Sequence, residues 1–237
     1  MPEILELGDV SVEVVLKDIK NIHLSVYPPT GRVRIAAPSR TSLETIRLFA
    51  ISKLGWIKKQ QQKLKNQKRE QPREYVERES HYVWGKRYLL SVVEHDAPSV
   101  VELQTKKLIL KVRHGADLAT RRHVMEQWYR KQLKVAAQEL IQKWEKVLQV
   151  KSKGLFVRRM KTKWGSCNPQ KQTIRLNTDL ARKPPECLEY VVVHELAHLI
   201  ERSHNERFTA ILDNALPNWE QTRDHLNQSP LPYENWQ

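Results

Sequence analysis

The segment at residues 117–148 constrains the fold most, because it is long and contains neither proline nor glycine. Its apolar side chains recur at intervals close to the 3.6-residue period of an α-helix. The apolar stripe comprises Val124, Trp128, Leu133, Ala137, Leu140, Trp144 and Leu148. These residues predict one long amphipathic helix in the middle of the chain.

Short runs with strand character dominate the chain before this helix. Three runs, at residues 11–16, 22–27 and 33–37, predict a small antiparallel meander, because prolines and Gly31 form a turn signal between the last two. Gly85 is the turn residue between the first two of four further runs, which predict hairpins. These four runs lie at residues 82–84, 88–93, 100–103 and 108–112.

A helix is expected between these two groups of strands, with Thr41 or Ser42 as its N-cap. It carries apolar residues as far as Ile57 and then becomes polar. Residues 53–73 contain eight basic residues and a single acid, Glu70. This stretch therefore predicts a solvated helix tail or a linker.

After the long helix we expect a strand at residues 155–160, a turn around Gly165 and a second strand at residues 173–177. The next helix begins near Pro184 and Pro185, since proline is tolerated in a first helical turn. The sequence shows no internal repeat. The predicted fold class is α+β.

The helix that begins near Pro184 contains an H-E-x-x-H motif at residues 194–198. Residues four apart share a helix face, so His194 and His198 are expected to bind one Zn²⁺. Three valines at residues 191–193 are expected to bury this helix. Glu195 is the predicted general base, which takes a proton from water activated by the metal and passes it to the leaving amine.

His204, ten residues after His194, is the predicted third ligand, beyond an expected helix end at residues 201–203. Three histidines with one open coordination position are typical of a catalytic zinc site. Glu201 is the alternative third ligand, but it follows His198 by only three residues on the same predicted helix. Zinc is the expected metal, although imidazole ligands suit several divalent ions.

Four motifs in the second half of the chain occur together: KWGSC at residues 163–167, IRLN at 174–177, YVVVHELAH at 190–198 and HNERF at 204–208. Their order and spacing resemble the YgjP-like predicted metal-dependent hydrolases, which in turn resemble SprT-like and Spartan-type proteases. This chain has Phe208-Thr209 where the family usually has an aromatic pair. The resemblance implies a β-rich N-terminal region with a long basic helix at residues 1–115. It also implies a zincin-like metallopeptidase region at residues 116–237, helical, with a small sheet that carries the H-E-x-x-H helix.

The resemblance further implies that an edge strand of this small sheet pairs with an extended substrate, and residues 173–177 are the candidate strand. Trp164 is a candidate wall of the substrate pocket, or alternatively a core residue. Asn177 is a candidate hydrogen-bond donor near the metal, or alternatively a strand end. Cys167 is expected to be an inert buried thiol, with contact to the zinc as the alternative.

The chain is strongly basic, with 41 lysines and arginines against 27 acids, a net charge of +14 and a pI near 9.8. Such a charge favours polyanionic partners. Residues 151–163 contain six basic residues and no acid directly before Trp164. Together with residues 53–73 they make nucleic acid a candidate partner through phosphate contacts, the alternative being a solvated charged face.

Three functions follow from these features. The expected one is a zinc metallopeptidase acting on peptide or protein substrates. The alternatives are a metal-dependent nucleotide phosphohydrolase (pyrophosphatase), and a nucleic-acid-associated binding module or a protease acting on DNA-bound proteins. No apolar run is long enough to span a membrane, and Met1 to Val10 include no lysine or arginine, so a cytoplasmic location is expected. The sequence does not indicate the oligomeric state.

Overall fold

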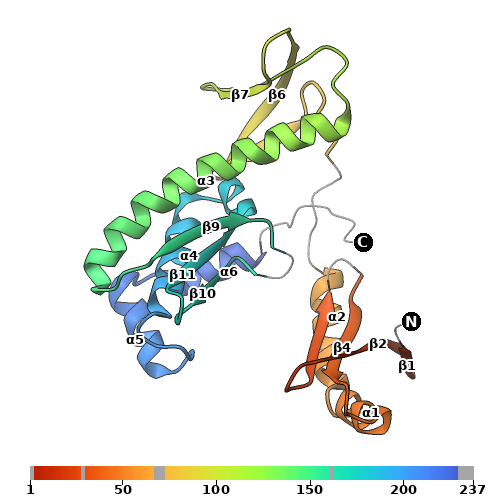
Figure 1. The fold of residues 1–237 in the computed structure, drawn as a ribbon. Coiled ribbons are helices and arrows are strands. Elements are labelled where there is room, and N and C mark those ends of the chain that lie inside the picture. Colours follow the sequence, from red (N-terminus) through yellow and green to blue (C-terminus); the bar gives the residue numbers. More distant parts are fainter. Residues whose placement is uncertain (1–2, 28–29, 67–72, 161–162, 229–237) are drawn as a thin grey trace. The chain divides into compact units, whose positions relative to one another are not determined.

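The computed structural model describes residues 3–27, 30–66, 73–160 and 163–228 (Figure 1). These residues form two compact units, one within residues 3–66 and the other within residues 73–228. Each unit combines helices with small sheets, so the predicted α+β class is confirmed.

The first unit consists of a four-stranded sheet and two helices. Its elements are β1 (Glu3–Leu7), β2 (Val10–Lys17), β3 (His23–Tyr27), β4 (Arg32–Pro38), α1 (Leu43–Ser52) and α2 (Leu54–Asn66). The strands lie in the order β1-β2-β4-β3, with β2 and β4 parallel in the centre and antiparallel pairs at both edges. Alternate residues of the central strands, such as Val12 and Ile35, are fully buried and pack with Ile46 of α1.

The predicted antiparallel meander is therefore wrong, because β2 pairs in parallel with β4 instead of pairing with β3. Burial accounts for this arrangement. β2 and β4 each alternate buried with more exposed side chains, whereas β3 has no buried residue. The two strands with the stronger apolar face occupy the centre of the sheet, and β3 lies at its edge.

The helix predicted to continue to Ile57 is interrupted after Ser52. The Ser52 hydroxyl donates a hydrogen bond to the Phe49 carbonyl at 2.7 Å, and Gly55, a weak helix former, follows closely. The predicted N-cap is confirmed, since the Ser42 hydroxyl accepts a hydrogen bond from the Thr45 amide at 3.2 Å. Residues 67–72 of the predicted basic tail lie outside the described residues.

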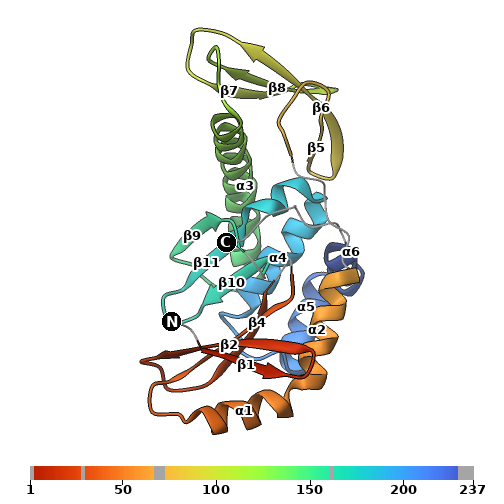
Figure 2. The same ribbon diagram turned by 90° about the vertical axis from the view of Figure 1, so that its right-hand side faces the viewer.

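The second unit begins with another four-stranded sheet, visible in Figure 2. Its strands are β5 (Ser80–Val83), β6 (Lys86–Glu94), β7 (Val100–Leu103) and β8 (Lys107–Val112). The order β5-β6-β8-β7, with a parallel pair in the centre and antiparallel pairs at the edges, is the same as in the first unit. The two units thus share a sheet topology that the strand runs in the sequence did not predict.

The long predicted helix is confirmed as α3 (Leu118–Leu148), with 31 residues. Asp117 is its N-cap, and the carboxylate accepts a hydrogen bond from the Thr120 amide at 2.8 Å. The buried stripe is shifted by one residue from several predicted positions. It comprises Met125, Tyr129, Leu133, Ala137, Ile141 and Trp144.

The remaining elements surround the helix that carries the H-E-x-x-H motif. They are β9 (Gly154–Arg158), β10 (Gly165–Asn168), β11 (Thr173–Asn177), the 3₁₀-helix η1 (Thr178–Arg182), α4 (Pro185–Ala197), α5 (Glu206–Ala215) and α6 (Trp219–Gln228). The sheet order is β10-β11-β9. The turn predicted around Gly165 is instead the start of β10, which pairs antiparallel with β11.

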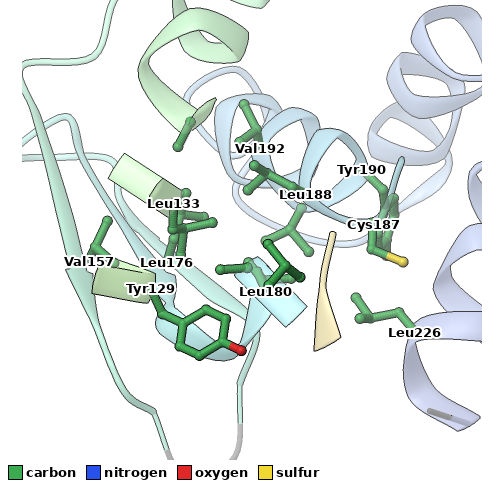
Figure 3. Packing of buried hydrophobic residues seen from close by; sticks show 14 of the residues in the cluster. Tyr129, Leu133, Val157, Leu176, Leu180, Cys187, Leu188, Tyr190, Val192 and Leu226 are labelled. Atoms are coloured by element: carbon green, nitrogen blue, oxygen red, sulfur yellow. The ribbon is translucent and has the colours of Figure 1, made fainter. Parts of the chain in front are cut away.

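One hydrophobic core joins all parts of the second unit. Figure 3 shows side chains of α3, β9, β11, η1, α4 and α6 packed together, including Leu133, Leu176 and Val192. Leu108 and Leu110 of β8 belong to the same core. The domain boundary expected at residues 115 and 116 therefore falls inside the second unit, between β8 and the helix on which this sheet packs.

Within the described residues, no helix has both the length and the apolar character that crossing a bilayer requires.

Candidate metal centre

Three histidine rings meet beside α4. His194 lies in the last turn of this helix, and His198 is its C-cap residue. His204 precedes α5, whose N-cap residue Asn205 accepts a hydrogen bond from the Phe208 amide at 3.0 Å. One ring nitrogen from each of the three histidines lies within 4.8 Å of the other two, and no other such group occurs among the described residues. The structure thus brings together the three predicted ligands.

The hydrogen bonds of these rings suit a metal ion. His198 Nδ1 lies 3.1 Å from the carbonyl oxygen of Glu201. A carbonyl only accepts, so Nδ1 carries the proton and Nε2 keeps a free lone pair. The Nε2 atoms of His194 and His204 are 3.1 Å apart, close to the roughly 3.4 Å expected of two nitrogens on one tetrahedral zinc ion. The donor set therefore fits a zinc ion.

The protonation state of His194 also suits a metal ligand. Burial, together with the nearby rings of His198 and His204, lowers the pKa of His194 to about 4. The ring is therefore neutral at pH 7, as a metal ligand must be. His194 Nδ1 is buried and has no hydrogen-bond partner among the described residues.

Glu201 does not take the place of a ligand. Its carboxylate accepts a hydrogen bond from the Ser203 amide at 3.1 Å, and its carbonyl orients His198. Both groups therefore serve the loop that leads to His204. This geometry favours His204 over Glu201 as the third ligand.

Phe208 is a site residue to which the sequence assigned no role beyond its place in a motif. Its ring is buried in α5, and its centroid lies 5.0 Å from that of His194 and 4.7 Å from those of His198 and His204. One aromatic side chain thus packs against all three predicted ligands. Its position four residues after His204, in the first turn of the following helix, was the available signal.

Glu195 is almost fully buried, with 5% of its surface exposed. Burial raises its pKa to about 8, while Lys163 and a hydrogen bond from the Cys167 amide act in the opposite direction. Burial thus makes the Glu195 carboxylate a stronger base than an exposed carboxylate.

The approach of β10 to Glu195 depends on Gly165. A Cβ atom at this position would lie 2.5 Å from Glu195 Oε1 and 2.8 Å from Val191 Cγ1. Both distances are shorter than real contacts allow, so only glycine lets the strand pass this close to α4. The sequence interpretation of Gly165 as a turn residue missed this steric reason.

A cleft of about 870 Å³ runs along β10 and α4 and extends to α6. His194, Glu195, His198 and His204 line it. β10 is the edge strand beside the cleft, whereas β11 lies in the middle of the sheet. The prediction that residues 173–177 form the substrate edge is therefore wrong, because the strand at residues 165–168 was not foreseen.

The two predicted substrate-binding residues have different surroundings in the structure. Trp164 lines the cleft and also packs against the core. Asn177 does not line it. Its Nδ2 donates to the carbonyls of Met160 and Lys163, each at 3.0 Å, and its Oδ1 accepts from the Asp179 amide at 3.2 Å. Asn177 therefore holds the backbone of the loop before β10 in place.

Cys167 lies on β10 and lines the cleft, but it is not part of the histidine group. Burial and the nearby Glu195 carboxylate raise the pKa of its thiol to about 11. The thiol is thus protonated at pH 7. It is only partly buried, in contrast to the expected buried thiol, and its inertness stays a prediction.

Two residues of the basic stretch at residues 151–163 form ion pairs with acids. Lys151 pairs with Glu145 at 3.0 Å, and Arg159 lies 3.3 Å from both Glu126 and Asp179. Of the described residues between 151 and 163, only Lys163 lines the cleft. Residues 161 and 162 lie outside the described part of the chain. Nothing in this geometry singles out a nucleic-acid surface, which stays a prediction.

The chain is similar to one protein family and, over part of its length, to solved structures. A family model described as YgjP-like, metallopeptidase domain, matches residues 20–229. No curated protein matches the chain. Among solved structures, the metallopeptidase zymogen of Pyrococcus abyssi abylysin is 20% identical, with a TM-score of 0.36 over 38% of this chain and 90% of its own. The zymogen of Methanocaldococcus jannaschii jannalysin is 23% identical, with a TM-score of 0.35 over 39% and 94%.

Proposed function

The chain belongs to the YgjP-like family of metallopeptidase domains, and from this premise we propose that it is a zinc peptidase in which Glu195 is the general base. His194, His198 and His204 are the proposed ligands of one Zn²⁺. The observation that carries the proposal is the meeting of three ring nitrogens next to a buried carboxylate in one cleft. Peptides or proteins are the proposed substrates.

When bound, zinc supplies a Lewis acid that polarises the scissile carbonyl and makes water a stronger acid. Glu195 accepts a proton from the attacking water at a carboxylate oxygen and delivers it to the nitrogen of the leaving amine. The Cys167 amide orients the carboxylate for both transfers. Phe208 keeps the three rings in place from the side of α5.

β10 is the proposed backbone partner of the substrate. It is an edge strand and borders the cleft along its length, from Gly165 to Asn168. A peptide added to such an edge forms main-chain hydrogen bonds, which give affinity with little demand on side-chain sequence.

One observation favours the nucleotide phosphohydrolase as a second candidate. Four basic residues line the cleft, Lys163, Arg175, Arg202 and Arg223, while Glu195 is the only acid among the described lining residues. Phosphoryl transfer, however, is commonly supported by a second metal ion. The described residues offer no second group of three ligands, so the peptidase is the better supported function.

Glu195→Gln tests the proposed base. We expect the variant to keep its zinc and to lose hydrolysis of a fluorogenic peptide by about 100-fold or more, because an amide does not accept the proton. Glu186→Gln, an exposed position on the same helix, is the matched control and should retain activity. Turnover of Glu195→Gln at the parent rate would show that another group is the base.

His204→Ala tests the ligand set. Metal analysis of the purified variant should show well below one zinc per chain, whereas His123→Ala, an exposed position on α3, should bind zinc normally. Full zinc content and activity in His204→Ala would revive Glu201 as the ligand. Hydrolysis of nucleoside triphosphates without hydrolysis of any peptide would replace the peptidase with the second candidate.

A further inference from the structure

A second cavity, which we call the arginine pocket, lies between α3, the end of β9 and η1. It has a volume of about 130 Å³ and shares no lining residue with the metal cleft. Its charged lining residues are Glu126, Arg130, Arg158, Arg159, Asp179 and Arg182. Four arginines thus line this cavity: Arg130 from α3, Arg158 from the end of β9, Arg159 directly after it and Arg182 from η1.

The floor of the arginine pocket is built from buried groups. The side chain of Arg182 is 6% exposed, and its Nη1 donates to Asp179 Oδ1 at 3.1 Å. Its guanidinium carbon lies 4.7 Å from the ring centroid of Tyr129, a cation–π contact. This residue is therefore held in one position before any ligand arrives.

The two carboxylates of the arginine pocket are shared between arginines. Arg159 Nε lies 3.3 Å from Asp179 Oδ2, the second oxygen of the carboxylate that Arg182 contacts. Arg159 Nη1 lies 3.3 Å from Glu126 Oε1, which Arg122 also contacts at 2.9 Å. Among the charged lining residues, four arginines face two acids, so the pocket has an excess of two positive charges.

The excess positive charge is at the solvent-exposed side of the arginine pocket. Arg130 and Arg158 are exposed, and neither has a carboxylate within ion-pair distance among the residues that the structure describes. Like charges gathered around a partly buried space repel one another unless an anion lies between them. Guanidinium groups bind the oxygens of tetrahedral oxyanions in a forked geometry, and the hydroxyl of Thr178 adds a further polar group to the wall.

We propose that the arginine pocket binds a phosphoryl group. Arg130 and Arg158 contact its outer oxygens, and Arg159 and Arg182 supply the positive field beneath it. The site is independent of the metal, since none of its residues lines the metal cleft. Its occupant would lie beside η1, the segment that connects β11 to α4.

The test is calorimetric titration of the full-length, zinc-loaded protein with inorganic phosphate at constant ionic strength in chloride. We expect saturable binding to one site, and the double variant Arg130→Gln/Arg158→Gln should weaken it at least about tenfold. Arg47→Gln/Arg87→Gln removes the same charge from exposed positions elsewhere and should bind phosphate as the parent does. The single variants Arg130→Gln and Arg158→Gln should each give part of the loss, which keeps the test valid if the double variant does not fold.

Further arms identify the source of the phosphoryl group. A short DNA duplex that competes with phosphate, and whose affinity falls in the double variant but not in its control, would assign the pocket to a nucleic-acid backbone. Phosphate binding without competition from DNA would assign it to a small phosphorylated ligand. Phosphate affinity that is unchanged in the double variant, or the absence of saturable binding, would overturn the proposal. Phosphate that binds the double variant with the affinity of the parent would be bound in the metal cleft, and this result would count against the proposal.

Discussion

The sheets β1–β4 and β5–β8 have the same strand order and the same pairing directions, yet they serve different parts of the molecule. The first is followed by two short helices, α1 and α2, and packs into a hydrophobic cluster of its own. The second is followed by α3, which is uninterrupted for 31 residues and about 46 Å. Because α3 extends beyond its sheet, it joins that sheet to the core that supports the metal centre.

The first hairpin turn of each sheet contains a glycine, but the two glycines have different surroundings. Gly8, in the turn between β1 and β2, has φ +66°, and a Cβ atom there would meet nothing within 4 Å. Gly85, in the turn between β5 and β6, has φ +76°, and a Cβ atom would lie 2.9 Å from Pro184 Cγ. The amides of Trp84 and Gly85 also donate to the carbonyls of Ala181 and Arg182. The comparison shows that contacts made outside the sheet, and not its topology, connect it to the site.

Removal of the metal should have the largest effect, and this effect should be confined to the second unit. A ligand present at 1,000 times its Kd stabilises the state that binds it by about 4 kcal/mol. Chelation should therefore abolish hydrolysis and speed amide hydrogen exchange in α4 and α5, with no change in β2 and β4. Hydrogen-exchange mass spectrometry measures both regions in one sample. Equal acceleration in α4 and α5 and in β2 and β4 would contradict the separation of the two cores.

A matched pair of core substitutions sharpens the comparison further. Leu133→Ala in α3 and Ile35→Ala in β4 each truncate a side chain with no exposed surface, at a cost of about 3 kcal/mol. Only Leu133→Ala should also weaken zinc binding, because Leu133 lies in the core that carries α4. Urea unfolding gives the stability, and a zinc titration gives the affinity. Loss of zinc affinity in Ile35→Ala would show that the first unit supports the metal centre.

The parts of the structure that the sequence could predict depend on local patterns. The existence of α3, the Ser42 cap and the spacing of His194 and His198 each depend on residues within a turn or two of helix, so the chain specifies them directly. The exact buried stripe of α3 was displaced by one residue at several positions. The same reasoning found the runs that became β2, β3 and β4. It also predicted the third histidine, which lies within 4.8 Å of the other two in the structure.

The parts that escaped prediction depend on contacts between distant residues. The parallel pairing of β2 with β4 is decided by which strands have a fully buried face, and a list of apolar runs does not contain that information. β10 was missed because Gly165, a poor strand former, was interpreted as a turn residue. The strand pairs with β11 and passes close to α4. Asn177 was a candidate hydrogen-bond donor near the metal or a strand end, and the structure has it as the last residue of β11, with its amide bonded to the loop before β10.

The two turn glycines allow a smaller and more local test. Gly8→Ala should cost about 1 kcal/mol, the strain of a left-handed conformation without glycine. Gly85→Ala carries the same strain and also overlaps Pro184, so its total cost should be about 2 kcal/mol or more. Thermal unfolding of both variants measures the difference. Equal costs would show that the β5–β6 turn does not dock against the segment before α4.

The smallest expected effect is a difference in acid sensitivity at the far end of α3. Glu145 is 8% exposed, and its carboxylate accepts hydrogen bonds from the amide and hydroxyl of Ser152, each at 2.7 Å, and from Lys151 at 3.0 Å. Burial acts to raise the pKa of Glu145, but these donors outweigh it, and the pKa lies below its ordinary value. A lowered pKa means that the ionised form stabilises the fold at neutral pH and that this contribution is lost as the pH falls below about 4.5.

Glu145→Gln should therefore lower the free energy of unfolding of the second unit at pH 7. It should also reduce the slope of this free energy against pH in acid, by the equivalent of at most about one bound proton. Glu139→Gln, at an exposed position on the same helix, is the control and should leave the profile unchanged. Urea unfolding at a series of pH values between 3 and 7 gives the two slopes. An unchanged slope in Glu145→Gln would mean that the pKa of Glu145 is the same in the folded and the unfolded chain. The junction between α3 and β9 would then be held by packing and not by charge, as the core of the first unit is.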